Sequence, residues 1–132
     1  MKDLRIKKLK PMFTTVLTTL NAYEEDLVVD GIVKFPKGSL KLYQTVLAVG
    51  SSVRDIKEGD VVLLNYFNYA IPMYKEGSVK NNITEMEQHI EFKIPKLLID
   101  DKLVGKFTDR DVEGIVEEYE EVETEKAKEA LL

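Results

Sequence analysis

The sequence has 132 residues, of which 44% are hydrophobic and 33% are charged, and it contains no cysteine. This length and composition predict one domain with a real hydrophobic core, and they exclude disulfide bonds and thiolate chemistry. The net charge of −5 argues against a general nucleic-acid binder, and the lack of a long apolar run or an apolar start predicts a cytoplasmic protein without a membrane span.

The first half of the chain alternates short β-rich runs with turn signals. Leu4–Lys10 is predicted to be a short extended segment. We predict strands at Thr14–Leu20 and Leu40–Val49, because both runs are rich in β-branched and apolar residues. Between these strands, Asp30-Gly31 separates two short apolar pieces, and this dipeptide predicts a tight turn.

The middle of the chain predicts a strand, a turn and a second strand. Gly59 can take a positive φ at no steric cost, so Lys57–Asp60 is predicted to be a turn. Val61–Leu64 is apolar at every position, which predicts a central strand of a small barrel. The aromatic residues that follow are Tyr66, Phe67, Tyr69 and Tyr74. They could stack on bases, but packing in a core or an interface fits a negatively charged chain better.

The composition of the next region gives weaker signals. Glu76–Ser78 and Lys80–Asn82 are loop-like, whereas Thr84–Gln88 fits either a helical turn or a loop. Apolar and charged residues alternate over Ile90–Ile94, and this period predicts a half-buried strand. Further along, Asp100-Asp101 is predicted to be a turn, and Val104–Phe107 is predicted to be either the last barrel strand or a link to it.

The two ends of the chain carry opposite charges. Residues 1–10 contain five basic residues and one acid, and residues 109–132 contain ten acids and three basic residues. Such ends can meet each other, within one subunit or between neighbours, or they can simply be solvated faces. Glu, Lys, Ala and Leu dominate after Glu117, so we predict an acidic helical tail over 119–132 that follows a domain at 1–118.

Residues suited to catalysis or metal binding are few. His89 is the only histidine, and its neighbours Glu87 and Glu91 would share a strand face with it rather than enclose a reacting atom, so it is interpreted as a surface residue. The aspartates at 100–101 and at 109 and 111 could bind calcium, but they lack the spaced ligand series of a dedicated loop. The sequence therefore predicts a protein that is not an enzyme, with no cofactor and no metal.

Four segments in a fixed order resemble the GroES-like co-chaperonins. They are Gly31-Ile32-Val33, Val46–Gly50, Ile56–Leu63 and Phe107–Glu117. The resemblance covers about residues 4–118 and implies an all-β fold, a small irregular GroES-like β-barrel, to which the composition adds the C-terminal helical extension. It also implies assembly into a ring, in which the first strand of one subunit pairs with the last strand of its neighbour.

The resemblance also implies which residues bind partners. The apolar tripeptide that docks in a chaperonin groove matches Gly31, Ile32 and Val33, with Lys34 in the place of a third apolar residue. The subunit interface is expected to contain Leu4, Ile6, Lys8, Val112, Ile115 and Val116. A short Ser51–Asp55 link, a longer 68–103 region and the added tail depart from the family pattern and are similar to phage-encoded members.

These observations leave two hypotheses for the function. In the first, the protein is a ring-forming co-chaperonin that caps a chaperonin cage and assists protein folding. In the second, it is a virion structural protein, an auxiliary or decoration protein of the capsid, that keeps the barrel without binding a chaperonin. The expected partners are accordingly a chaperonin or capsid subunits, in the host cytoplasm or the virion, and not nucleic acid or a membrane. A small enzyme or ligand-binding barrel is disfavoured because the chain has no cysteine and a single histidine.

Overall fold

The computed structural model describes residues 1–80 and 83–122, and this part of the chain is built from strands. Its helical content is limited to two short 3-10 turns, η1 (Phe67–Tyr69) and η2 (Asp109–Asp111), which confirms the predicted all-β class. Residues 119–122 are not helical, and the rest of the predicted tail at 119–132 lies outside the described residues. Over the same described ranges, no helix is long and apolar enough to cross a membrane.

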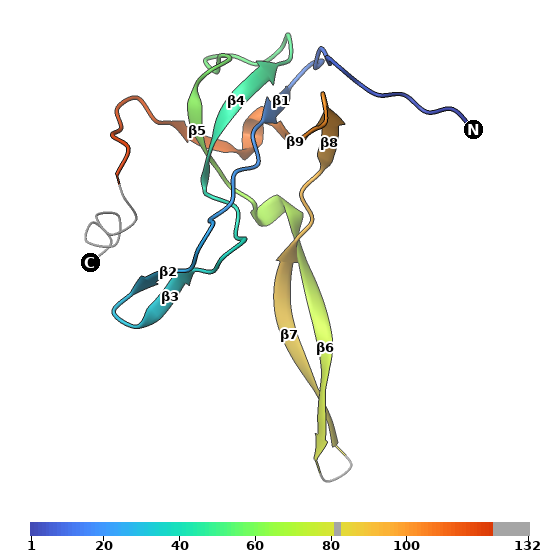
Figure 1. Ribbon diagram of the computed structural model, residues 1–132, viewed down its shortest axis with the longest axis vertical. Helices are drawn as coiled ribbons and strands as arrows, with labels where there is room; N and C mark the ends of the chain where they lie inside the picture. The colour runs from blue at the N-terminus through green and yellow to red at the C-terminus, as the bar shows by residue number, and fades with distance from the viewer. Residues whose placement is uncertain (81–82, 123–132) are drawn as a thin grey trace.

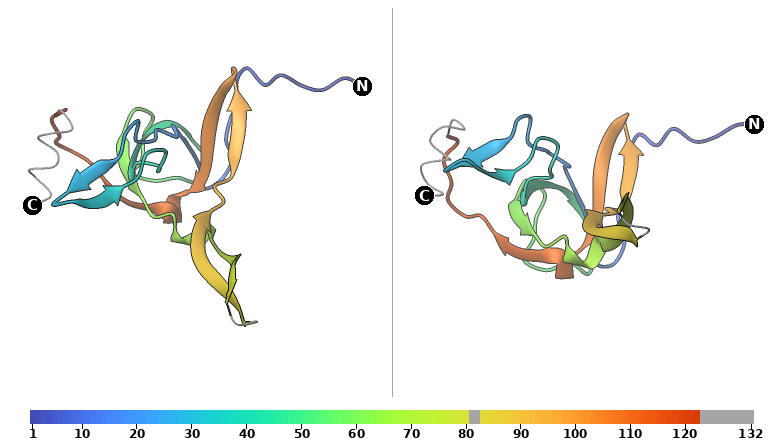
Figure 2. Two further views of the ribbon diagram at one scale, coloured as in Figure 1. Left: turned by 60° about the horizontal axis from the view of Figure 1, so that its bottom comes forward. Right: turned by 90° about the horizontal axis from the view of Figure 1, so that it is seen from below.

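A curved six-stranded antiparallel sheet forms the body of the molecule (Figures 1 and 2). Its strand order is β10-β5-β4-β1-β9-β8, so that β10 and β8 are the two edges. The strands are β1 (Thr15–Thr18), β4 (Tyr43–Val49), β5 (Val61–Leu64), β8 (Lys96–Ile99), β9 (Lys102–Thr108) and β10 (Val112–Ile115). β1, β4 and β5 lie within the strands predicted from the sequence, and β9 contains the predicted run Val104–Phe107.

The burial of β5 differs from the prediction. Val62 and Leu64 are buried, but Leu63 is 40% exposed. The strand is internal to the sheet, between β4 and β10, yet only one face of the sheet covers the core. A continuous apolar run does not by itself tell a strand buried on both faces from one with a single buried face.

Two hairpins project from the body (Figure 1). The shorter one joins β2 (Leu27–Val29) to β3 (Ile32–Phe35), and the longer one pairs β6 (Ala70–Lys80) with β7 (Ile83–Phe92). The loops predicted at Glu76–Ser78 and at Lys80 are therefore wrong, as is the helical turn or loop at Thr84–Gln88, while residues 81–82 lie outside the described part. Glycine and serine stand where the register shifts between Glu76 and Val79, and a bulge tolerates such residues inside a strand.

The predicted tight turns are confirmed. Asp30 and Gly31 have φ angles of 51° and 77° between β2 and β3, as a two-residue hairpin turn requires. Asp100 and Asp101 form the corresponding turn between β8 and β9, with φ angles of 50° and 60°. Aspartate is among the few residues other than glycine that adopt this left-handed conformation readily. Gly59 has a φ of 92° in the turn that precedes β5.

The core packs against one face of the sheet. Its buried residues are Val16, Val46, Val62, Leu64, Tyr66, Ile94 and Phe107. The ring of Phe107 contacts the rings of Tyr66 and Tyr69, with centroids 5.9 and 5.7 Å apart. The aromatic run is therefore divided, because Tyr66 and Tyr69 pack against the core whereas Phe67 is 74% exposed.

Gly50 follows β4 at a point where two backbone segments cross closely. A Cβ atom at this position would lie 2.2 Å from the carbonyl oxygen of Phe13 and 2.7 Å from that of Met12. Hydrogen bonds hold the crossing, because the N–H of Gly50 donates to Thr15 at 2.8 Å and that of Ser52 donates to Phe13 at 2.9 Å. Neither backbone segment can move away without breaking these bonds.

We therefore predict that Gly50→Ala lowers the free energy of unfolding by about 2 kcal/mol, as forced overpacking does in other proteins. Gly114→Ala is the matched control, because no atom lies within 4 Å of its added Cβ. Urea denaturation of both variants measures the difference. Equal midpoints for the two variants would contradict the prediction.

Candidate partner-binding site

The tip of the β2–β3 hairpin presents two apolar side chains to solvent. Ile32 is 67% exposed and Val33 is 48% exposed, directly after the turn at Gly31. Across the hairpin, Leu27 and Val29 are buried at 3% and 7%. The short turn thus reverses the chain so that β2 is covered while the first residues of β3 face outward. All three residues predicted to bind a partner lie together at this tip.

The stalk of the hairpin is held by a buried glutamine, Gln44 of β4. Its side-chain amide donates to the carbonyl oxygens of Asn21 and Lys41, at 2.9 and 3.0 Å, and its oxygen accepts from the backbone N–H of Asn21 at 2.8 Å. These bonds join the segment that enters the hairpin, at Asn21, to the segment that leaves it, at Lys41. The hairpin is consequently fixed to the sheet by direct hydrogen bonds within the protein.

Aromatic contacts extend this support toward the tip. The rings of Tyr23 and Phe35 stack with centroids 5.0 Å apart, and the ammonium of Lys41 lies over the rings of Tyr23 and Tyr43 at 5.5 and 5.7 Å. Burial raises the pKa of Tyr23, and the neighbouring Tyr43 raises it further, so the Tyr23 hydroxyl stays neutral at physiological pH. A cation that lies over two aromatic rings stabilises the stalk modestly.

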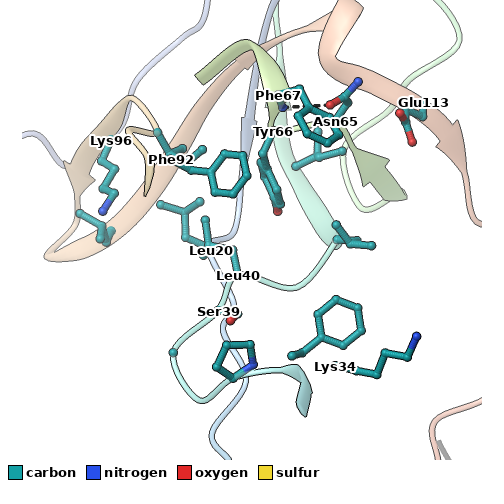
Figure 3. Close-up of a pocket in the computed structure, with 17 residues that line it drawn as sticks. Leu20, Lys34, Ser39, Leu40, Asn65, Tyr66, Phe67, Phe92, Lys96 and Glu113 are labelled. Carbon is teal, nitrogen blue, oxygen red and sulfur yellow. Dashed lines mark hydrogen bonds between the residues drawn. The ribbon is translucent and has the colours of Figure 1, made fainter. Parts of the chain in front are cut away.

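A cleft of about 800 Å³ lies between the root of this hairpin and the base of the β6–β7 hairpin (Figure 3). The rings of Tyr66 and Phe92 face each other in its middle, and Lys34 and Lys96 lie on opposite sides of it. Its other lining residues are Leu20, Phe35, Pro36, Gly38, Ser39, Leu40, Leu42, Leu64, Asn65, Phe67, Ile94, Leu103 and Glu113. The cleft is therefore mostly apolar, with charged groups at its rim; sequence reasoning did not identify it, because its walls come from distant segments.

One of the predicted interface residues of the N-terminal arm, residues 1–10, contacts the β8–β9 turn. Leu4 is 87% exposed, and Lys8 is also exposed. The carbonyl oxygen of Ile6 accepts a hydrogen bond from the N–H of Asp100 at 2.8 Å, and Arg5 forms an ion pair with Asp101. The arm forms no strand within the chain.

The other predicted interface residues lie in or after β10. Val112 packs against the core, Ile115 is 37% exposed, and the N–H of Val116 donates to the carbonyl oxygen of Val61 at 2.7 Å. β10 pairs with β5 along one side and forms an edge of the sheet. The structure does not bring the arm and β10 together, because the arm contacts the turn next to the opposite edge strand (Figures 1 and 2).

A buried carboxylate, Asp111, connects β10 to the base of the long hairpin. It accepts hydrogen bonds from Asn68 Nδ2 at 2.9 Å, from the Tyr69 hydroxyl at 2.5 Å, and from the backbone N–H and the hydroxyl of Thr108 at 3.0 and 3.3 Å. Burial acts to raise the pKa of Asp111, but these hydrogen bonds outweigh it and hold the pKa below the usual range. Sequence reasoning missed this cluster, although the Thr108-x-x-Asp111 spacing is that of a capping box.

The described residues include no group of three or more histidine, cysteine, aspartate or glutamate residues that could hold a metal ion. Asp100 and Asp101 form a hairpin turn, and Asp111 is fully engaged by hydrogen-bond donors. The predicted turn is thus found at Asp100 and Asp101, whereas Asp111 ends the 3-10 turn η2. No protein-family model matches the chain, and no curated protein is significantly similar to it.

Proposed function

We propose that the protein is a GroES-like co-chaperonin that assembles into a ring, caps a chaperonin cage and assists protein folding. The observation that carries the proposal is the exposed pair Ile32 and Val33 at the tip of a projecting hairpin. Burying such a side chain in an apolar groove contributes about 1.5–3 kcal/mol. Lys34 is also exposed, and its long side chain can keep the ammonium in water while its neighbours are buried.

Two features of the single chain support the proposed ring. β10 is an edge strand with a half-exposed Ile115, and the arm is an extended basic segment on the other side of the molecule. Pairing of the arm with the β10 of a neighbour would cover both, and exposed edges are otherwise prone to aggregate. The opposite charges of the two ends would steer this pairing. In the proposal, the curved sheet is the partly open barrel of one subunit and residues 119–132 are its helical extension.

We predict that Ile32→Asp reduces capture by a chaperonin at least tenfold, because a carboxylate cannot enter an apolar groove without a large desolvation cost. The measurement is a pull-down of the purified chain on a bacterial chaperonin in the presence of ATP. Leu98→Asp is the matched control, because Leu98 is 63% exposed on the edge strand β8, which is not part of the β2–β3 hairpin. Failure of the unmodified chain to bind, or equal binding of both variants, would contradict the proposal.

The virion structural protein remains the second candidate, and the β6–β7 hairpin is the observation that favours it. This hairpin forms a two-stranded sheet of its own, separate from the body. An isolated two-stranded hairpin is marginally stable in water, so the β6–β7 hairpin is expected to pack against a partner. Mass spectrometry of purified virions tests this candidate, and a copy number that matches the capsid subunits would favour it over the co-chaperonin.

A further inference from the structure

The cleft beside the β2–β3 hairpin has the features of a surface that another segment covers. Phe67 is 74% exposed and Phe92 is 47% exposed, although both line the cleft, and such exposure of neighbouring large aromatic residues is unusual. Lys34 and Lys96 stand on opposite sides of it, and neither forms an ion pair with another described residue. Glu113 is the single acid in the lining. The fitting occupant is an apolar segment that carries several negative charges.

Residues 117–122 have this chemistry. The segment reads Glu-Glu-Tyr-Glu-Glu-Val, and it is exposed and without regular structure. Tyr119 is 65% exposed and Val122 is 44% exposed, so two apolar side chains stand in solvent among four carboxylates. The aromatic ring of Tyr119 could pack between Phe67 and Phe92, while the flanking glutamates approach the two lysines.

The direction of β10 favours the cleft of another copy. Along β10, Val112 pairs with Leu64 and Ile115 pairs with Val62, and the N–H of Val116 then bonds to Val61. The cleft is lined by Leu64, by the residues that follow it and by Glu113 of β10, whereas the chain leaves β10 beside Val61, at the opposite end of β5 from Leu64. Residues 116–122 contain no glycine or proline that would favour a reversal.

We propose that residues 117–122 of one copy dock in the cleft of a second copy. The proposal rests on the self-association proposed above, but it uses a different surface from the arm and β10. It gives the acidic segment a specific receptor, formed by the roots of both projecting hairpins. Association through this surface should weaken with salt, because the pairs of opposite charge lie at an exposed rim.

Charge reversal on the full chain tests the proposal. Lys34→Glu/Lys96→Glu and Glu118→Lys/Glu120→Lys are each expected to weaken self-association about tenfold or more, since like charges then face each other. A chain that carries all four substitutions should recover it, because the charges are complementary again. Sedimentation velocity over a concentration series measures the association. Lys57→Glu/Lys106→Glu, two exposed lysines outside the cleft, is the control and should associate like the unmodified chain.

A second measurement separates this proposal from the co-chaperonin function. Fluorescence anisotropy of a labelled peptide of residues 116–122 should show binding to the full chain and a loss of about tenfold in affinity with Lys34→Glu/Lys96→Glu. Neither readout involves a chaperonin, so failed chaperonin capture with intact peptide binding would overturn only the proposed function. Three outcomes would overturn the docking proposal. They are unchanged peptide binding by Lys34→Glu/Lys96→Glu, no recovery of association in the chain with all four substitutions, and peptide binding by a chain that stays monomeric.

Discussion

Replacing Phe107 with alanine is expected to lower the free energy of unfolding by about 4 kcal/mol, as removal of a buried phenylalanine ring commonly does. Phe107 is 1% exposed and contacts the rings of Tyr66 and Tyr69. These neighbours are fixed by hydrogen bonds, because the Tyr66 hydroxyl donates to the carbonyl oxygen of Lys41 at 2.6 Å and the Tyr69 hydroxyl donates to Asp111. They cannot move to fill the cavity, so most of its cost should remain.

Phe67→Ala provides the control for this prediction. The same ring is removed, but Phe67 is 74% exposed and contacts the ring of Phe92 with a centroid distance of 6.4 Å. We expect a loss of about 1 kcal/mol or less, the magnitude of one aromatic pair. Urea denaturation followed by circular dichroism gives both values. Similar losses for the two variants would show that the core is not centred on Phe107.

The turns were the most predictable part of the fold, because single residues determine them. Asp30-Gly31 and Gly59 have the positive φ angles that their sequence context indicated, since few residues adopt this conformation without strain. The strands followed from apolar runs between these turns. The apolar runs did not predict how many faces of each strand are buried, because this depends on what packs against the sheet. Leu63 is an example, since it is 40% exposed on an internal strand.

The long hairpin was missed for a physical reason. Residues 76–82 include glycine, serine and asparagine, which weaken strand propensity in any single-residue scale. In the structure, Glu76, Val79 and Lys80 of β6 pair with residues of β7, with a register shift between Glu76 and Val79. Cross-strand pairing with the residues just across the hairpin therefore overrides local preference, and single-residue propensities do not include this pairing.

The candidate site was predicted only in part. Gly31, Ile32 and Val33 were selected through the resemblance to the GroES-like co-chaperonins, and the structure exposes Ile32 and Val33 at the hairpin tip. The cleft and the Asp111 cluster could not be found in this way, because their members come from segments that are far apart in the sequence. The pairing of Leu4, Ile6 and Lys8 with Val112, Ile115 and Val116 of a neighbour stays a prediction, since it requires a second copy.

The Asp111 cluster joins the parts of the molecule on which both proposals depend. Asn68 and Tyr69 belong to η1 at the base of the long hairpin, Thr108 ends β9, and Asp111 itself leads into the edge strand β10. One carboxylate therefore sets the direction of the hairpin that forms one wall of the cleft and the position of the edge offered to a neighbour. Its removal should affect stability first and assembly as a consequence.

We predict that Asp111→Asn lowers the free energy of unfolding by about 3 kcal/mol at pH 7, the cost of leaving buried donors without their acceptor. Asparagine keeps the shape of aspartate but has one acceptor oxygen and an amide that points two further hydrogens at the surrounding donors. Tyr69 remains a donor throughout, because burial and the neighbouring Asp111 raise the pKa of its hydroxyl. Tyr69→Phe, which removes a single donor, should cost about 1 kcal/mol.

The pH dependence separates a charge effect from a simple packing effect. The pKa of Asp111 is lowered in the folded chain, so its ionised form stabilises the fold fully above the ordinary carboxyl pKa of about 3.9. This contribution is lost as the pH falls through the lower folded pKa. The difference between the unmodified chain and Asp111→Asn, measured by urea denaturation, should therefore stay constant from about pH 8 to 5 and narrow below about pH 4. A gap that persists unchanged to pH 3, or full additivity of Asp111→Asn with Tyr69→Phe, would show that the carboxylate charge is not what holds the cluster together.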